Sequence, residues 1–163
     1  INQVLSQDRE KVSKGSETTA VFYSISNCQK GLKGISFGNF LIKQVANAIR
    51  TDYPNIKDFV TLSPVPGFMD WLELNNNELF KSIDNGQFIN ETDEYKDDIL
   101  KNSLDYFFNS ERSDKLPNDS VARFHLGNGA YLHRINFLGD LSNKALNSAD
   151  GLMVNYKYDL DKI

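Results

Sequence analysis

The sequence predicts an α/β or α+β domain built on a mixed β-sheet, and three observations support this fold class. Short runs of β-branched and aromatic residues at 20–26, 59–62 and 152–158 are typical of strands. Helical apolar periodicity lies between them, most clearly over 93–108 and in the stretch that ends at Tyr53-Pro54. The first two strands are separated by a crossover long enough for parallel pairing.

The composition restricts the possible partners. A chain of 163 residues is long enough for one domain with a core, and its formal net charge of −4 gives no attraction to nucleic acid or to an anionic membrane surface. No apolar run approaches the roughly 18 residues needed to span a bilayer. The single cysteine, Cys28, cannot form an internal disulfide. With no targeting segment visible, we expect a cytoplasmic protein that binds neither nucleic acid nor membrane.

A glycine-rich loop follows the first strand. It contains Gly31, Gly34, Gly38 and two lysines, and it leads directly into a helix that ends at Tyr53-Pro54. Strand, glycine loop and helix start together form an arrangement that binds phosphates through free backbone N–H groups. Walker and Gly-x-Gly-x-x-Gly patterns are absent, so tight packing of the turn remains an equal alternative. The apolar periodicity predicts that the buried face of this helix consists of Phe40, Leu41, Val45, Ala48 and Ile49.

The second strand, 59–62, stops abruptly at Ser63, which is followed by Pro64, Pro66 and Gly67. Proline lacks a donor for the sheet ladder, so the strand has to end near Ser63. A hydroxyl at the carboxyl end of a buried strand lies where open α/β sheets bind ligands. An ordinary turn role for Ser63 is the alternative.

The remaining elements are predicted from shorter patterns. Residues 73–119 are polar and acidic, and we expect a single amphipathic helix there, with a solvated acidic face and loops on either side. Ser120 is expected to cap a short helix that carries Val121, Phe124 and His125 on one face and ends at Gly127. A strand over 131–137 and small helices near 69–72 and 142–148 complete the prediction.

The chain contains two histidines, His125 and His133. Without nearby cysteines or paired carboxylates they make a poor metal site, so we expect no metal. A histidine on an apolar helix face is commonly a core residue, yet a neutral imidazole is also the usual proton donor or acceptor. Ser63 and His125 together would make a nucleophile–base pair or a substrate anchor with a proton donor. Ser63 lacks a Gly-x-Ser-x-Gly elbow, which argues against an α/β-hydrolase.

Several ungapped stretches resemble the malonyl-CoA decarboxylase family. They occur in the family's order and cover roughly residues 20–72 and 118–162. The matching stretches are 22–26, 31–43, 61–68 (Thr-Leu-Ser-Pro-Val-Pro-Gly-Phe), 121–126 with 128–130 (Val-Ala-Arg-Phe-His-Leu and Asn-Gly-Ala), and 151–156 with 158–160.

The resemblance implies a GNAT-like acyl-CoA-binding fold, with a central mixed β-sheet flanked by helices and its N-terminal strands missing. Residues 1–163 would be a partial C-terminal catalytic domain that lacks the helical domain preceding it in the family. Consistent with a fragment, the chain has no initiator Met and stops at Ile163 directly after a strand-like run. The resemblance also implies a homo-oligomer for the full-length protein.

The activity implied by the resemblance is decarboxylation of malonyl-CoA to acetyl-CoA and CO2, without a metal or organic cofactor. The family's catalytic serine and histidine fall on Ser63, which would orient the malonyl group, and His125, which would protonate the enolate. Two alternatives remain open: a GNAT-type acyl-CoA N-acyltransferase and a non-catalytic CoA-binding fragment. The family's CoA-binding loop falls on Lys33, Gly34, Ile35, Ser36, Phe37, Gly38 and Asn39.

Overall fold

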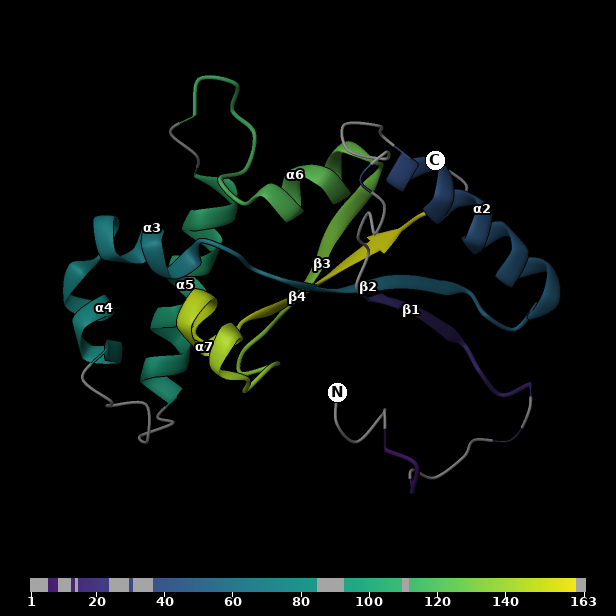
Figure 1. Ribbon diagram of the computed structural model, residues 1–163, viewed down its shortest axis with the longest axis horizontal. Helices are drawn as coiled ribbons and strands as arrows, with labels where there is room; N and C mark the ends of the chain where they lie inside the picture. Colours follow the sequence, from purple (N-terminus) through teal and green to yellow (C-terminus); the bar gives the residue numbers. More distant parts are fainter. Residues whose placement is uncertain are drawn as a thin grey trace.

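A computed structural model describes residues 6–8, 13, 15–23, 30, 37–84, 93–109 and 112–160. Four strands in these ranges form one mixed sheet in the order β1-β2-β4-β3 (Figure 1). β1 (Thr19–Tyr23) runs parallel to β2 (Asp58–Pro64), whereas β4 (Met153–Tyr158) is antiparallel to both β2 and β3 (Ala130–Asn136). The predicted mixed sheet is confirmed, including the parallel pairing of the first two strands.

One face of the sheet is buried, and we call it the inner face. Side chains alternate along a strand, so every second residue of β2 points to the same side. The register of β2 and β4 places Phe59 opposite Tyr158 and Ser63 opposite Val154, which aligns the inner-face residues of the two strands. The buried inner-face residues of these strands are Phe59, Thr61, Ser63, Val154, Tyr156 and Tyr158.

Helix α2 (Phe37–Asp52) lies over the sheet on the same side as α6 (Ser120–Gly127) (Figure 1). Its end before Tyr53 was predicted, but its predicted buried face was wrong. Ile42 and Ala46 are the buried residues of this helix, whereas Phe40 is 59% exposed and Leu41 57%. Three consecutive apolar residues at 40–42 allow more than one helical stripe, and contact with the sheet selects the i, i+4 pair Ile42 and Ala46.

Helices α3 (Phe68–Asn75), α4 (Asn77–Asp84) and α5 (Asp93–Phe108) gather beyond the carboxyl end of β2 (Figure 1). The predicted bounds of α5 are confirmed. Helix α4 was missed, because its segment was interpreted as a solvated loop. The side chain of Asn76 accepts a hydrogen bond from the Leu79 amide (3.2 Å), and Ile83 is buried. The sequence therefore contained the signals of a helix, a capping asparagine followed by an apolar stripe. They were missed because the asparagine belongs to a run of three asparagines, which favours a loop.

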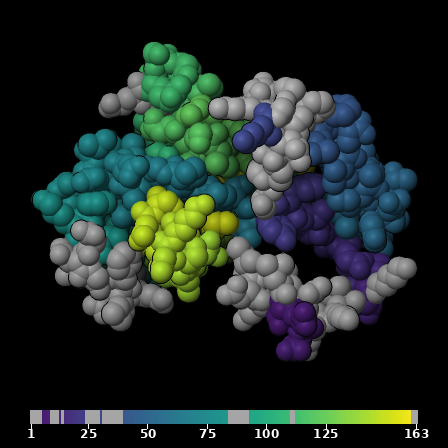
Figure 2. Space-filling model, in the orientation of Figure 1, coloured from purple at the N-terminus to yellow at the C-terminus, as the bar shows by residue number. Residues whose placement is uncertain are grey.

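The two short C-terminal helices begin at side-chain caps. The cap of α6 is Asp119, whose Oδ1 accepts from the Ala122 amide (2.6 Å), so the predicted cap at Ser120 was wrong by one residue. Helix α7 (Asn143–Ala149) is capped by Ser142 and lies on the visible face of the molecule, next to α3 (Figure 2). Among the described residues, no helix has both the length and the apolar character to cross a membrane.

Candidate active site

The structure brings Ser63 and His125 together. Ser63 lies at the carboxyl end of β2, where the two following prolines end the strand, and His125 lies on the sheet-facing side of α6. Ser63 Oγ is 3.2 Å from His125 Nε2, and the two residues are 5% and 3% exposed. This places the two side chains within direct hydrogen-bonding distance.

Thr61 extends the contact on the Ser63 side. Ser63 Oγ donates a hydrogen bond to Thr61 Oγ1 (2.9 Å), which also accepts one from the Tyr156 amide (3.0 Å). Thr61 is fully buried between β1 and β4. The sequence analysis missed Thr61, although its position two residues before Ser63 on a strand already implied that the two share a face.

Tyr158 extends the contact on the His125 side. Its hydroxyl lies 2.8 Å from His125 Nδ1, and burial raises the pKa of Tyr158 well above its usual value, so the hydroxyl keeps its proton. The neighbouring inner-face residue, Tyr156, stacks on the imidazole with a centroid distance of 4.7 Å and an interplanar angle of 22°. Both tyrosines were predicted to be on the last strand, but no role was assigned to either.

The protonation of His125 follows from its surroundings. Burial lowers the pKa of His125 to about 4, so at neutral pH the imidazole carries one proton. Ser63 uses its own hydroxyl proton toward Thr61 and therefore accepts from His125. The proton then lies on Nε2, and Nδ1 accepts from Tyr158. A chain of three hydrogen bonds thus runs from Tyr158 through His125 and Ser63 to Thr61.

The predicted CoA loop falls mostly outside the described residues. Lys33, Gly34, Ile35 and Ser36 are not described, and the structure gives only backbone for 37–39, in the first turn of α2. The loop therefore stays a prediction.

His133 is exposed on β3, and the described part of the chain holds no group of three His, Cys, Asp or Glu residues that could bind a metal ion. The absence of a metal cofactor likewise stays a prediction.

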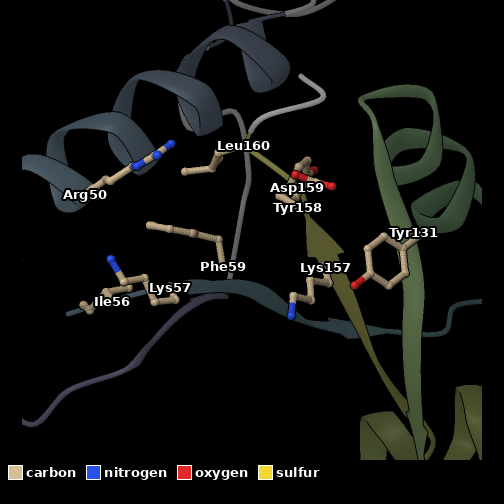
Figure 3. Close-up of a pocket in the computed structure, with 9 residues that line it drawn as sticks. All are labelled: Arg50, Ile56, Lys57, Phe59, Tyr131, Lys157, Tyr158, Asp159 and Leu160. Carbon is tan, nitrogen blue, oxygen red and sulfur yellow. The ribbon is translucent and has the colours of Figure 1, made fainter. Parts of the chain in front are cut away.

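A separate cavity of about 360 Å³ opens near the start of β2 (Figure 3). It lies at the opposite end of the strand from Ser63, because Phe59 is four residues before Ser63, or about 13 Å along a strand. Tyr158 contributes to both places, since it lines the cavity and contacts His125. The sequence analysis did not predict this cavity, whose lining is Arg50, Ile56, Lys57, Phe59, Tyr131, Lys157, Tyr158, Asp159 and Leu160.

The fold and the buried pair define a GNAT-like α/β domain with a candidate active site at the end of β2. The solved loading GNATL domain of CurA from Lyngbya majuscula shares the fold, with a TM-score of 0.54 at 12% identity over 90% of this chain and 57% of that chain. The family described as malonyl-CoA decarboxylase C-terminal domain matches residues 1–163. The chain belongs to the malonyl-CoA decarboxylase family.

Individual relatives agree with this assignment. The chain is 36% identical to the mitochondrial malonyl-CoA decarboxylase of Anser anser anser, over 99% of this chain and 37% of the relative. The corresponding protein of Rattus norvegicus is 34% identical over 94% of this chain and 38% of the relative. The solved malonyl-CoA decarboxylase from Rhodopseudomonas palustris aligns with a TM-score of 0.85 and 45% identity, over 98% of this chain and 40% of that chain. This chain therefore spans about two fifths of the relatives that it matches.

Proposed function

We propose that the full-length protein decarboxylates malonyl-CoA to acetyl-CoA and CO2, with Ser63 and His125 at the reacting group. Relatives named malonyl-CoA decarboxylase, 36% and 45% identical to this chain, support the choice of substrate. The observation that carries the assignment of the site is the 3.2 Å contact between Ser63 Oγ and His125 Nε2.

Ser63 acts on the malonyl carboxylate in this proposal. Its hydroxyl turns from Thr61 to the substrate and holds the carboxylate so that the breaking C–C bond is perpendicular to the thioester plane. The bond breaks, CO2 leaves, and the electron pair remains on the substrate as a thioester enolate. Orientation of this kind lowers the barrier because the reacting orbitals are aligned before the step begins.

His125 completes the reaction by protonation. The Nε2–H of the neutral imidazole gives its proton to the nascent acetyl carbon and forms the new C–H bond. Tyr158 holds Nδ1 and so keeps the donating nitrogen directed toward Ser63. A proton from solvent then restores the imidazole, so the overall reaction consumes one proton for each CO2 released.

No metal or organic cofactor takes part in this proposal. The CoA moiety of the substrate would be held by the segment from Lys33 to Asn39, which leads into the start of α2. Backbone N–H groups at a helix start favour a pyrophosphate because they are unpaired and carry the positive end of the helix dipole.

Two substitutions test the function in the full-length chain. Ser63→Ala and His125→Asn should each lower kcat by about 100-fold, the usual scale for losing an orienting group or a positioned acid. The readout is the release of CO2 and acetyl-CoA from malonyl-CoA. His133→Asn, at the exposed histidine on β3, is the matched control. Near-normal turnover by both site variants would contradict the assignment.

Assays on the same protein distinguish the two alternative functions. An acyl-CoA N-acyltransferase would consume acetyl-CoA in the presence of an amine panel and would leave malonyl-CoA intact. A non-catalytic CoA-binding domain would bind CoA, measured by isothermal titration calorimetry, without turning over either thioester.

We also propose that these residues form the C-terminal catalytic domain of a longer chain, preceded by a helical domain, and that the full-length protein is a homo-oligomer. Light scattering after size-exclusion chromatography measures its mass, and a monomer would contradict the proposal.

A cytoplasmic location also stays a prediction, since the relatives from Anser anser anser and Rattus norvegicus are named mitochondrial. Fractionation of cells that express the natural chain tests the location.

A further inference from the structure

A buried polar bridge joins the turn after Ser63 to the helix that carries His125. The hydroxyl of Tyr106, on α5, donates to the Pro66 carbonyl (2.9 Å) and lies 3.4 Å from Asp119 Oδ2. The other carboxyl oxygen of Asp119 accepts a hydrogen bond from the first turn of α6 (2.6 Å). Pro66 follows Ser63 by three positions, so the bridge reaches both halves of the candidate site.

We propose that Tyr106 and Asp119 are positioning residues that fix the separation of Ser63 from His125. The turn and the helix share no strand pairing; β4 links β2 to His125 through Tyr158, and a further contact holds the turn itself against the start of α6. Helix α5 supplies it through the hydroxyl of Tyr106. The catalytic consequence of this inference rests on the function proposed above, whereas its structural consequence does not.

The ring of Tyr106 is held independently of its hydroxyl. Phe68, Trp71 and Phe107 surround it at centroid distances of 5.7, 5.6 and 5.5 Å. Removing the hydroxyl therefore leaves the aromatic packing in place and breaks the polar bridge alone. This makes Tyr106→Phe a specific test, because the fold does not depend on the oxygen to place the ring.

The charge state of Asp119 is compatible with such a bridge. Burial raises the pKa of Asp119 to about 6, and the hydrogen bonds from the Ala122 amide and the Tyr106 hydroxyl lower it by smaller amounts. With a pKa near 6, Asp119 is mostly ionised at neutral pH, and the Tyr106 hydroxyl shares its proton between Asp119 Oδ2 and the Pro66 carbonyl. Protonation of Asp119 below this pKa weakens the acceptor at Oδ2 and leaves the Tyr106 proton to the Pro66 carbonyl.

The charge of Asp119 also acts on Tyr156, the tyrosine that stacks on the imidazole. Burial raises the pKa of Tyr156, and the negative charge of Asp119 raises it further, so the two groups interact. The Tyr156 hydroxyl is buried and has no hydrogen-bond partner among the described residues. Its ring stacks on His125, so one tyrosine both responds to the charge of Asp119 and packs against the imidazole.

The first experiment compares Tyr106→Phe with Tyr95→Phe. Tyr95 is a matched control because its hydroxyl also donates to a buried carboxylate, that of Asp150 at the end of α7. The readouts are kcat and KM for malonyl-CoA in the full-length chain, together with the imidazole nitrogen chemical shifts of His125 in 15N-histidine-labelled protein. His133 gives the internal reference signal in the same spectrum.

We expect Tyr106→Phe to move both nitrogen signals of His125 and to lower kcat about tenfold, with KM within about twofold of the parent. Tyr95→Phe should leave the His125 signals and kcat unchanged. The proposal is overturned if the His125 signals stay in place in Tyr106→Phe, or if Tyr95→Phe moves them equally. A parent protein that releases no CO2 would defeat the proposed function, and the His125 signals would still decide the positioning role.

A second pair of variants separates the bridge from the helix cap. Asparagine and serine both cap helices about as well as aspartate, but only the amide introduced by Asp119→Asn is long enough to reach the Tyr106 hydroxyl. We expect Asp119→Asn to change the His125 signals and kcat less than Asp119→Ser, which should change both as Tyr106→Phe does. Equal behaviour of the two variants would overturn the bridge, even if Tyr106→Phe failed to fold.

Discussion

At the scale of single residues, the Ser63 hydroxyl is fixed from two sides. Thr61 accepts its proton at 2.9 Å, and His125 lies 3.2 Å away on the opposite element. Since all three side chains are at most 5% exposed, water competes little for these bonds. The oxygen is thereby held in place by both neighbours, and in the proposed reaction only its proton has to turn from Thr61 toward the substrate.

Tyr158 is the residue whose removal should disturb His125 most selectively. Tyr158→Phe keeps the ring on the inner face but removes the donor to His125 Nδ1, so that the hydrogen bond at Nε2 alone orients the imidazole. We expect kcat to fall about 10- to 100-fold, the range for a weakened general acid, with little change in KM. Steady-state kinetics with malonyl-CoA measures it.

Tyr131→Phe is the control for this change. Tyr131 is a half-exposed tyrosine of β3 that lies opposite Lys157 of the neighbouring strand. A loss of activity in Tyr131→Phe as large as that in Tyr158→Phe would contradict a specific role for the contact with His125.

At the scale of elements, the sequence predicted a helix or strand correctly where its local pattern is compatible with only one structure. Short runs of β-branched and aromatic residues placed β2 and β4 correctly, and helical periodicity placed α5 at its observed bounds. The buried face of α2 was wrong because three adjacent apolar residues allow two stripes, and only contact with the sheet chooses between them. The role of Tyr158 was inaccessible for a similar reason, since its partner His125 lies 33 residues away on another element.

The corrected face of α2 leads to a stability prediction. Ile42→Ala removes a side chain that is 4% exposed and should lower the free energy of unfolding by about 2–4 kcal/mol. Phe40→Ala, two positions earlier and 59% exposed, should change it by less than about 0.5 kcal/mol. Urea denaturation of the 163-residue chain compares them. A larger loss for Phe40→Ala would restore the face first expected from the sequence.

At the scale of the whole molecule, buried ionisable groups act on stability in opposite directions. The pKa of His125 is lowered to about 4 by burial, so between pH 6.5 and 4 the unfolded chain binds the extra proton and acid destabilises the fold. Burial raises the pKa of Asp119 and of Asp150 to about 6. Between pH 6 and 3.8 the folded chain binds those protons, and acid stabilises the fold.

Variants separate the two contributions. On going from pH 7.5 to pH 5, the stability of His125→Asn relative to the parent should rise by about 1–2 kcal/mol, because the variant lacks the imidazole that acid disfavours. The relative stability of Asp119→Asn should fall by about 1 kcal/mol over the same interval. Urea denaturation at the two pH values gives both differences. Changes of the same sign in the two variants would contradict the assignment.

The candidate site is formed by residues that lie far apart in the sequence, so it depends on the order in which the chain folds. Ser63 meets His125 across 62 residues, and Thr61 meets the Tyr156 amide across 95. Pairings of such high sequence separation form late, because a long stretch of chain has to be closed before they can stabilise anything. Helices can therefore form early in refolding. The contact between Ser63 and His125 is complete only after β4 has inserted between β2 and β3. Under the proposed function, the appearance of enzymatic activity would therefore report that the sheet is complete.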